Sequence, residues 1–234
     1  MNILGIIPAR EGSKRVINKN FRPFAGSSLV EIAINQALKS KLLTNIVISS
    51  DSEEVLNIGA KYPSVICLKR PIELANDLSP AIDYVKHVLE VIEPKLGKLF
   101  DMIVVLQPSS PLRDASDIDA TIQLLIDNKD RESAVSVVKV DHMIHPVKIK
   151  KLVNGLLVPF FEEENGRFAA QDLEDLYARN CAVYAIRKQF LLSRSSVISP
   201  DSLGYIMSPE TSVDINELLD FEFAEFLYNK NKAK

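Results

Sequence analysis

An apolar run that turns at once into a basic loop opens the chain: residues 3–15 read ILGIIPAREGSKR. The apolar part, Ile3–Pro8, predicts a buried strand, because parallel strands covered on both faces read as continuous hydrophobic runs. Residues 10–22 carry one acidic side chain, Glu11, and five basic ones: Arg10, Lys14, Arg15, Lys19 and Arg22. In α/β proteins, a loop of this kind at the carboxyl end of the first strand commonly holds a phosphate-bearing ligand. The alternative of a solvated basic turn stays open at this point.

Apolar runs rich in β-branched residues alternate with helical patterns up to about residue 140. The expected strands are Ile3–Pro8, Ile46–Ser49, Val65–Leu68, Met102–Leu106 and Ser133–Val140. The expected helices are Ser28–Ser40, one that starts near Asp51, Pro80–Val91 and Asp114–Asn128. This alternation predicts an α/β fold, in which helices cover both faces of a mostly parallel central sheet.

The pattern changes after about residue 140. A hairpin is expected at Val147–Val158 around Asn154-Gly155, a dipeptide typical of tight two-residue turns. A strand at Ala182–Ile186 and a helix at Ile215–Tyr228 complete the expected elements. We therefore expect a single domain over residues 1–234, with residues 141–180 as an excursion that serves dimerisation or substrate capture.

The composition is that of an ordinary soluble protein. Of the 234 residues, 47% are hydrophobic and 25% are charged, which allows a sizeable core. The net charge of −3 argues against a nucleic-acid-binding surface, because such surfaces are basic. Two cysteines imply no disulfide framework, and no apolar run is long enough to span a membrane. We expect a cytoplasmic protein that binds neither nucleic acid nor membranes.

The loop after the first strand lacks two familiar phosphate-binding motifs. It contains neither the Gly-x-Gly-x-x-Gly of dinucleotide-binding folds nor the Gly-x-x-x-x-Gly-Lys-Ser/Thr of Walker loops. It offers instead the backbone N–H groups of Gly12 and Ser13, with Arg10 and Lys19 as positive clamps. These groups suit a triphosphate that releases pyrophosphate, because negative charge builds on the leaving group in the transition state.

Six blocks of the sequence together carry a family resemblance. They are IPAREGSKR at 7–15 with Lys19-Asn20 after it, VISSDSEE at 47–54, KRPIELAND at 69–77, QPSSPLR at 107–113, NCAVY at 180–184 and SVDIN at 212–216. In this order the blocks resemble the motifs of the acylneuraminate cytidylyltransferases, the CMP-sialic acid synthetase family. The first and fourth blocks are the most specific, and the resemblance extends over residues 3–227, nearly the whole chain.

The resemblance implies a Rossmann-like nucleotidyltransferase fold and a reaction between CTP and an acidic nine-carbon sugar. The anomeric hydroxyl of the sugar would attack the α-phosphorus of CTP in line, giving a CMP-sugar and pyrophosphate. In such a reaction the protein mostly positions the reactants and neutralises charge. The resemblance also implies Mg²⁺ as cofactor and a homodimer.

Residue roles follow from the same resemblance. The implied catalytic residues are Arg10, Lys19 and Gln107. The implied nucleotide-binding residues are Pro8, Ala9, Arg10, Gly12, Ser13, Lys14, Asn20 and Arg70. The implied sugar-binding residues are Gln107, Ser109, Ser110, Gln171 and Tyr184. Asp214 and Asn216 are implied to hold the metal, because Mg²⁺ prefers oxygen ligands.

The chain departs from the family pattern at four positions. Asn216 stands where the family usually has a second carboxylate, so weaker Mg²⁺ binding is expected. Ala81 stands where a serine or threonine often contacts the nucleotide. Ala170 and Cys181 replace an arginine and a glycine in the sugar-facing part, which indicates a modified sugar such as legionaminic or pseudaminic acid.

Two other functions stay open beside this one. A CMP-KDO synthetase has a similar opening motif and would act on a related acidic sugar. A nucleotide-binding relative without catalytic activity would also accommodate Asn216, Ala81 and Ala170. If the sugar's carboxylate has lost an arginine partner, Arg167 or Arg179 is the candidate replacement, because an arginine fork binds a carboxylate through two hydrogen bonds.

Overall fold

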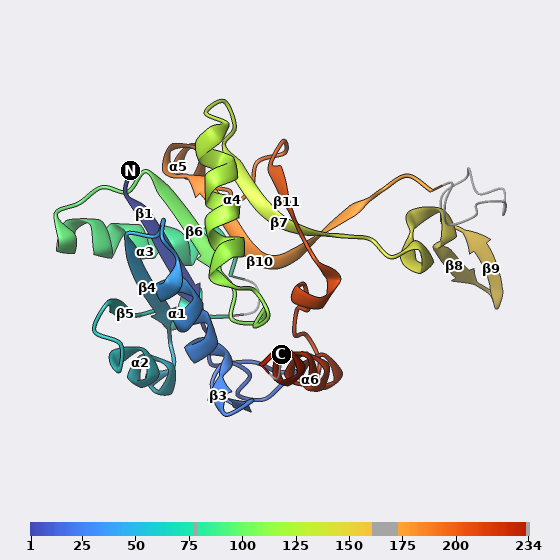
Figure 1. The fold of residues 1–234 in the computed structure, drawn as a ribbon, viewed down its shortest axis with the longest axis horizontal. Coiled ribbons are helices and arrows are strands. Elements are labelled where there is room, and N and C mark those ends of the chain that lie inside the picture. The colour runs from blue at the N-terminus through green and yellow to red at the C-terminus, as the bar shows by residue number, and fades with distance from the viewer. Residues whose placement is uncertain (77–78, 161–172, 233–234) are drawn as a thin grey trace.

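The computed structural model describes residues 1–76, 79–160 and 173–232. A seven-stranded sheet in the order β11-β7-β10-β6-β1-β4-β5 forms its centre (Figure 1). The strands of this sheet are β1 (Ile3–Pro8), β4 (Asn45–Ser50), β5 (Val65–Lys69), β6 (Met102–Leu106), β7 (Ser133–Lys139), β10 (Tyr177–Arg187) and β11 (Leu203–Met207). Neighbouring strands are parallel except at β10, which is antiparallel to β6 and β7. The predicted α/β fold with a mostly parallel sheet is therefore confirmed.

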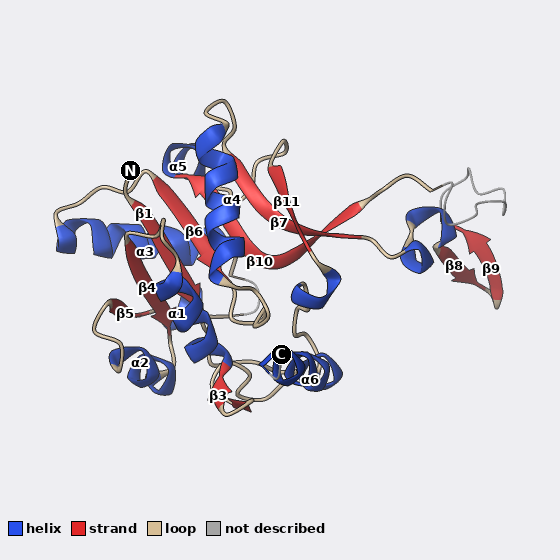
Figure 2. Ribbon diagram, in the orientation of Figure 1, coloured by secondary structure: helices blue, strands red, loops and turns tan. Residues whose placement is uncertain are grey.

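Helices cover both faces of the sheet (Figure 2). They are α1 (Leu29–Lys39), α2 (Glu53–Ala60), α3 (Ala81–Leu96), α4 (Ala115–Asp127), α5 (Lys188–Arg194) and α6 (Leu218–Lys232), with short 3₁₀ turns η1 (Ile72–Leu74), η2 (His142–Ile144), η3 (Pro146–Lys148) and η5 (Pro209–Thr211). The apolar residues of α1, α2 and α4 pack with Ile7 and Val104 on one face. Those of α3 and α5 pack with Ile6 and Val105 on the other. In the described part of the chain, no helix is long and apolar enough to cross a membrane.

Where the sequence signal is strong, the predicted boundaries of strands and helices agree with the structure to within one residue. Every residue of β1 and β6 is buried, so their continuous apolar runs predicted both strands correctly. Ser28 caps α1 by accepting a hydrogen bond from the Glu31 N–H group. Asp114 and Asp117 form a reciprocal capping box at the start of α4. The first and last of the helices expected before residue 140 therefore start within one residue of their predicted positions.

Other boundaries were wrong by several residues. Helix α3 does not end at Val91 but continues to Leu96, and Pro94 lies in its last turn. Helix α6 starts at Leu218 rather than at Ile215, because Ile215 bonds to Ser109 and Lys19 instead, as described below. Strand β10 is longer than expected, and both α5 and β11 were missed. Strand β11 lies at the edge of the sheet and contains Gly204, which weakens its strand pattern.

The segment after β7 extends away from the sheet as an arm. Strands β8 (Lys150–Val153) and β9 (Leu156–Pro159) form its hairpin, and Figure 1 shows this hairpin far from the sheet, beyond the ends of β7 and β10. Asn154 and Gly155 both have positive φ, as the expected two-residue turn requires. A second small ladder, β2 (Pro23–Phe24) with β3 (Ser27–Ser28), closes the basic loop before α1. The role of residues 141–180 stays a prediction.

Candidate functional site

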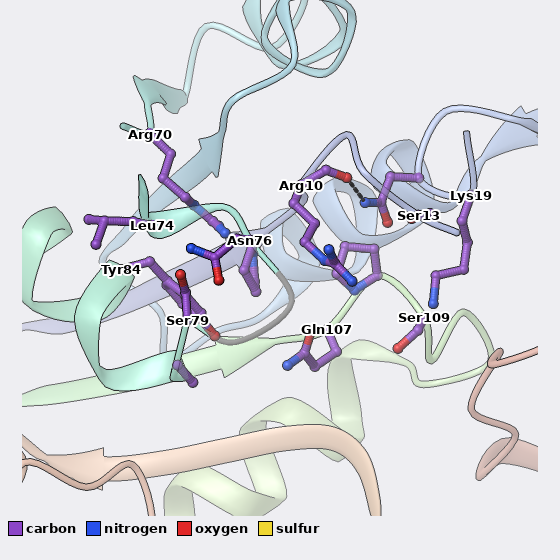
Figure 3. Close-up of a pocket in the computed structure, with 14 residues that line it drawn as sticks. Arg10, Ser13, Lys19, Arg70, Leu74, Asn76, Ser79, Tyr84, Gln107 and Ser109 are labelled. Atoms are coloured by element: carbon purple, nitrogen blue, oxygen red, sulfur yellow. Dashed lines mark hydrogen bonds between the residues drawn. The ribbon is translucent and has the colours of Figure 1, made fainter. Parts of the chain in front are cut away.

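A polar pocket of about 270 Å³ lies at the carboxyl ends of β1 and β6 (Figure 3). Its lining comprises Pro8, Arg10, Ser13, Lys19, Asn20, Arg70, Leu74, Asn76, Ser79, Ala81, Tyr84, Gln107, Pro108 and Ser109. The carboxyl ends of parallel strands are where open α/β sheets bind ligands, because the loops there diverge and leave a crevice. The pocket therefore stands where the fold favours ligand binding.

The basic loop supplies one end of this pocket. The Asn20 side-chain nitrogen donates to the Arg10 carbonyl at 2.8 Å, the bond that Figure 3 marks, and this contact closes the loop on itself. Lys19 Nζ donates to the Ile215 carbonyl at 2.8 Å. Burial lowers the pKa of Lys19; Arg15 and Arg10 lower it further, and Asp214 raises it. Because burial disfavours the charged form of Lys19, an incoming anion such as a triphosphate would stabilise that form strongly.

Arg70 and Tyr84 form the other end. Arg70 is 4% exposed; its Nε donates to Ser49 Oγ at 3.0 Å and its terminal nitrogen to the Ser49 carbonyl at 2.6 Å. The same carbonyl accepts the Ala9 N–H at 3.0 Å, so Arg70 is tied to the end of β1. The guanidinium lies over the Tyr84 ring, 4.5 Å from its centroid. Burial lowers the pKa of Arg70 and raises that of Tyr84 to about 12.

The loop after β6 forms the wall between the two ends. Arg113, which is fully buried, donates to the Gln107 carbonyl at 3.1 Å and to the Ala182 carbonyl at 2.7 Å. Burial lowers the pKa of Arg113 to about 10, and it still carries its charge at neutral pH. The Ser109 carbonyl accepts the Ile215 N–H at 2.9 Å. Ile215 thus connects this wall to Lys19, because its N–H bonds the wall and its carbonyl bonds the lysine. These bonds keep Ile215 out of helix α6.

The proposed metal ligands are in contact with each other and with the basic loop. The Asn216 side-chain nitrogen donates to Asp214 Oδ2 at 2.9 Å, and its oxygen accepts from Arg15 at 3.2 Å. Arg15 fixes this orientation, because a reversed amide would turn N–H groups toward the guanidinium. No cluster of three or more His, Cys, Asp and Glu side chains able to hold a metal occurs within the described residues.

This donor set fits Mg²⁺ through Asp214. Magnesium is commonly bound by one or two carboxylates together with substrate phosphates and water, so the single carboxylate of Asp214 would be sufficient for a metal that also contacts a bound phosphate. The Asn216 oxygen already accepts from Arg15, and the positive charge of that guanidinium opposes a second cation beside it. The metal-binding role of both residues stays a prediction.

The structure brings half of the expected site residues together in the pocket lining. Eight of them line the pocket: Pro8, Arg10, Ser13, Lys19, Asn20, Arg70, Gln107 and Ser109. The others lie outside its lining: Ala9 and Ser110 are buried behind it, Gly12 and Lys14 are exposed, and Tyr184, Asp214 and Asn216 stand beyond it. Ser110 Oγ donates to the Asn180 carbonyl, and Tyr184 donates to Cys181 Sγ. Gln171 and Arg167 lie outside the described residues.

The sequence interpretation missed part of the lining. Leu74, Asn76 and Pro108 fall inside recognised blocks but carried no assigned role. Tyr84 lies in the first turn of α3, in a stretch that the apolar pattern marked only as a core-packing helix. The spacing of Ala81 and Tyr84, three residues apart on one helix face, was the available signal.

One family model and several named proteins match this chain over nearly its whole length. The model of a family described as cytidylyltransferase matches residues 4–232. Post-translational flagellin modification protein B of Campylobacter coli is 32% identical over 99% of this chain and 97% of its own length. N-acylneuraminate cytidylyltransferase of Escherichia coli O18:K1:H7 is 30% identical over 99% of this chain, which spans 53% of that protein. Pseudaminic acid cytidylyltransferase of Campylobacter jejuni is 27% identical over 99% of this chain and 98% of its own length.

Solved structures agree on the fold. A structure of CMP:2-keto-3-deoxy-manno-octonic acid synthetase complexed with CTP has a TM-score of 0.72 to this chain, at 16% identity, and the match covers 99% of this chain and 100% of the other. This likeness confirms the expected Rossmann-like nucleotidyltransferase fold. Together with the family match over nearly the whole sequence, it means that the chain is a nucleotidyltransferase and belongs to the cytidylyltransferase family.

Proposed function

We propose that this protein transfers CMP from CTP to an acidic nonulosonic sugar and releases pyrophosphate. The observation that carries the proposal is the two-ended pocket, with Arg10 and Lys19 at one end and Arg70 and Tyr84 at the other. A nucleoside triphosphate has the same division into an anionic tail and a polar base. The names of the relatives supply the cytidine and the sugar class.

The roles of the residues follow from the charges that change in the reaction. Arg10, Ser13 and Lys19 bind the triphosphate and neutralise the charge that grows on the leaving pyrophosphate. Gln107, at the end of β6, orients the anomeric hydroxyl of the sugar toward the α-phosphorus, in line with the leaving group. Asp214 would hold Mg²⁺, whose charge would add to the neutralisation of the phosphates. The protein forms no covalent intermediate in this scheme.

The sugar is of the legionaminic or pseudaminic type. Relatives named for pseudaminic acid and for N,N'-diacetyllegionaminic acid support this class, and Cys181 adds a side chain where the family pattern has a glycine. Arg179, whose charge acts on both Cys181 and Tyr184, is the candidate partner of the sugar's carboxylate. Discrimination between such sugars rests on a few contacts, each worth about 1–3 kcal/mol.

Pyrophosphate release tests the reaction. The purified protein is assayed with CTP and Mg²⁺ against N-acetylneuraminic, legionaminic, pseudaminic and KDO acids, with ATP, GTP and UTP as nucleotide controls. We expect release with CTP and with one of the modified nine-carbon sugars. Release with KDO alone would move the protein to the CMP-KDO synthetases. Binding of CTP without release with any sugar would instead support a catalytically silent relative.

The protein acts as a homodimer in this proposal, and the arm is its interface. Both faces of the β8–β9 hairpin carry exposed apolar side chains: Leu152 and Leu157 pair on one face, and Val153 and Leu156 on the other. Leu157 is 72% exposed. A clustered apolar surface of this kind marks an interaction site more often than free surface. Sedimentation velocity of the double variant Leu152→Asp, Leu157→Asp is expected to show a monomer, and an unchanged dimer would exclude the arm.

A further inference from the structure

Tyr84 carries a buried hydroxyl that nothing in the described part of the chain satisfies. The side chain lies in the first turn of α3, is 7% exposed and lines the pocket. Its hydroxyl is enclosed and has no hydrogen-bond partner there. Buried polar groups in folded proteins are almost always paired, and an unpaired one destabilises the fold, so each exception needs an explanation.

The ring cannot easily turn to relieve this state. The Arg70 guanidinium covers one side of it at 4.5 Å from the centroid, and Ser49 holds that guanidinium through two hydrogen bonds. The neighbouring residue Val85 is fully buried in the core beneath the sheet. The hydroxyl is therefore held in one place, as expected of a group that is preorganised to bind a ligand.

Its place in the pocket identifies the partner. Figure 3 shows Tyr84 beside Asn76 and Ser79 on the Arg70 side, whereas Arg10 and Lys19 lie on the opposite side. A triphosphate bound by those two cations would direct the base of its nucleotide toward the Tyr84 end. The edge of cytosine offers hydrogen-bond acceptors at O2 and N3 and a donor at the exocyclic amine.

We propose that Tyr84 is a nucleobase-contacting residue, whose hydroxyl hydrogen-bonds the edge of the cytosine of CTP. The inference rests on the proposed function, since it takes CTP as the ligand. The pKa of about 12 keeps the hydroxyl protonated at neutral pH, so it can donate to a cytosine acceptor. Arg70 acts as a positioning residue for the ring, and CTP supplies the partner that the described residues do not provide.

The variant Tyr84→Phe tests this directly, because it keeps the ring and removes only the hydroxyl. Calorimetric titration without sugar is expected to show CTP binding weakened by about tenfold, the effect of one lost hydrogen bond. Binding of inorganic tripolyphosphate, which has no base, is expected to stay unchanged. The melting temperature of the free variant is expected not to fall, because an unpaired buried hydroxyl has been removed. Tyr62→Phe, on a ring packed against the opposite face of the sheet, is the matched control.

The outcomes separate the two proposals. An unchanged dissociation constant for CTP in Tyr84→Phe would overturn the base contact. Equal weakening of CTP and tripolyphosphate would also overturn it, since the hydroxyl would then act on the whole pocket. A lower melting temperature with unchanged CTP binding would mean that the hydroxyl is structural. If the unaltered protein binds tripolyphosphate but not CTP, the proposed function fails as well, whatever the variant does.

Discussion

The two ends of the pocket are built in different ways. Arg10 and Lys19 come from a loop whose neighbours Gly12 and Lys14 are exposed, and contacts to backbone carbonyls hold that loop. Arg70 follows a sheet strand, and Tyr84 belongs to a helix packed against the sheet. In the proposed reaction this difference suits two tasks: a loop can adjust as pyrophosphate leaves, whereas recognition of a base needs fixed donors and acceptors.

Removing a cation from the loop is expected to have the largest effect. Lys19→Ala should lower kcat/KM by about 10²–10³-fold, the loss typical of one group that stabilises transition-state charge. Steady-state pyrophosphate release with CTP measures this loss. Lys14→Ala is the comparison within the same loop, because Lys14 is exposed and does not line the pocket. Equal losses in the two variants would mean that the total charge of the loop, rather than the position of one cation, governs the rate.

A substitution at Asn216, on the side of the loop where the metal is proposed to bind, is expected to have a smaller effect. This effect strengthens metal binding, whereas Lys19→Ala weakens catalysis. Asn216→Asp removes the N–H that now bonds Asp214 and adds a second charge, so the Mg²⁺ concentration for half-maximal rate should fall by about tenfold. Titration of the CTP complex with Mn²⁺, followed by electron paramagnetic resonance, measures the metal directly. Asn216→Ala removes the amide without adding charge and is expected not to tighten binding. If both variants behave alike, charge at position 216 has no part in metal binding.

The sequence predicted these two ends unequally well. The strand Ile3–Pro8 and its basic loop stood out because an apolar run and a cluster of cations are local signals, readable without the fold. Tyr84 was missed because its stretch has the ordinary pattern of a helix that packs on a sheet. Its contact with Arg70 depends on where β5 and α3 meet, which no local pattern encodes. The late start of α6 was missed for a similar reason, since the bonds of Ile215 to Lys19 and Ser109 are distant in sequence.

The pH dependence of kcat/KM is expected to report the charge of Lys19 in the basic loop. Burial lowers the pKa of Lys19 from its ordinary 10.5, so the cation is lost at a lower pH than in a free lysine. Only the charged form attracts the triphosphate, and kcat/KM should therefore fall as the pH rises through the lowered pKa. The loss grows with the fraction of molecules that have given up this proton, so it begins as a partial loss at the onset of the alkaline limb. Lys19→Arg, which stays charged, should move this limb to higher pH; an unmoved limb would assign it to another group.

The smallest expected effect is a change in CTP binding at the Arg70 and Tyr84 end of the pocket. Ala81 lines the pocket three residues before Tyr84, so Ala81→Ser adds a hydroxyl on the same face of α3. This end is already ordered, and the new group loses little freedom on binding. CTP binding measured by calorimetry should therefore tighten by about twofold, a fraction of a buried hydrogen bond. Ala115→Ser, at the first residue of α4 and outside the pocket, is the matched control. A larger gain at position 81 than the loss in Tyr84→Phe would mean that Tyr84 is not the principal hydroxyl at this end.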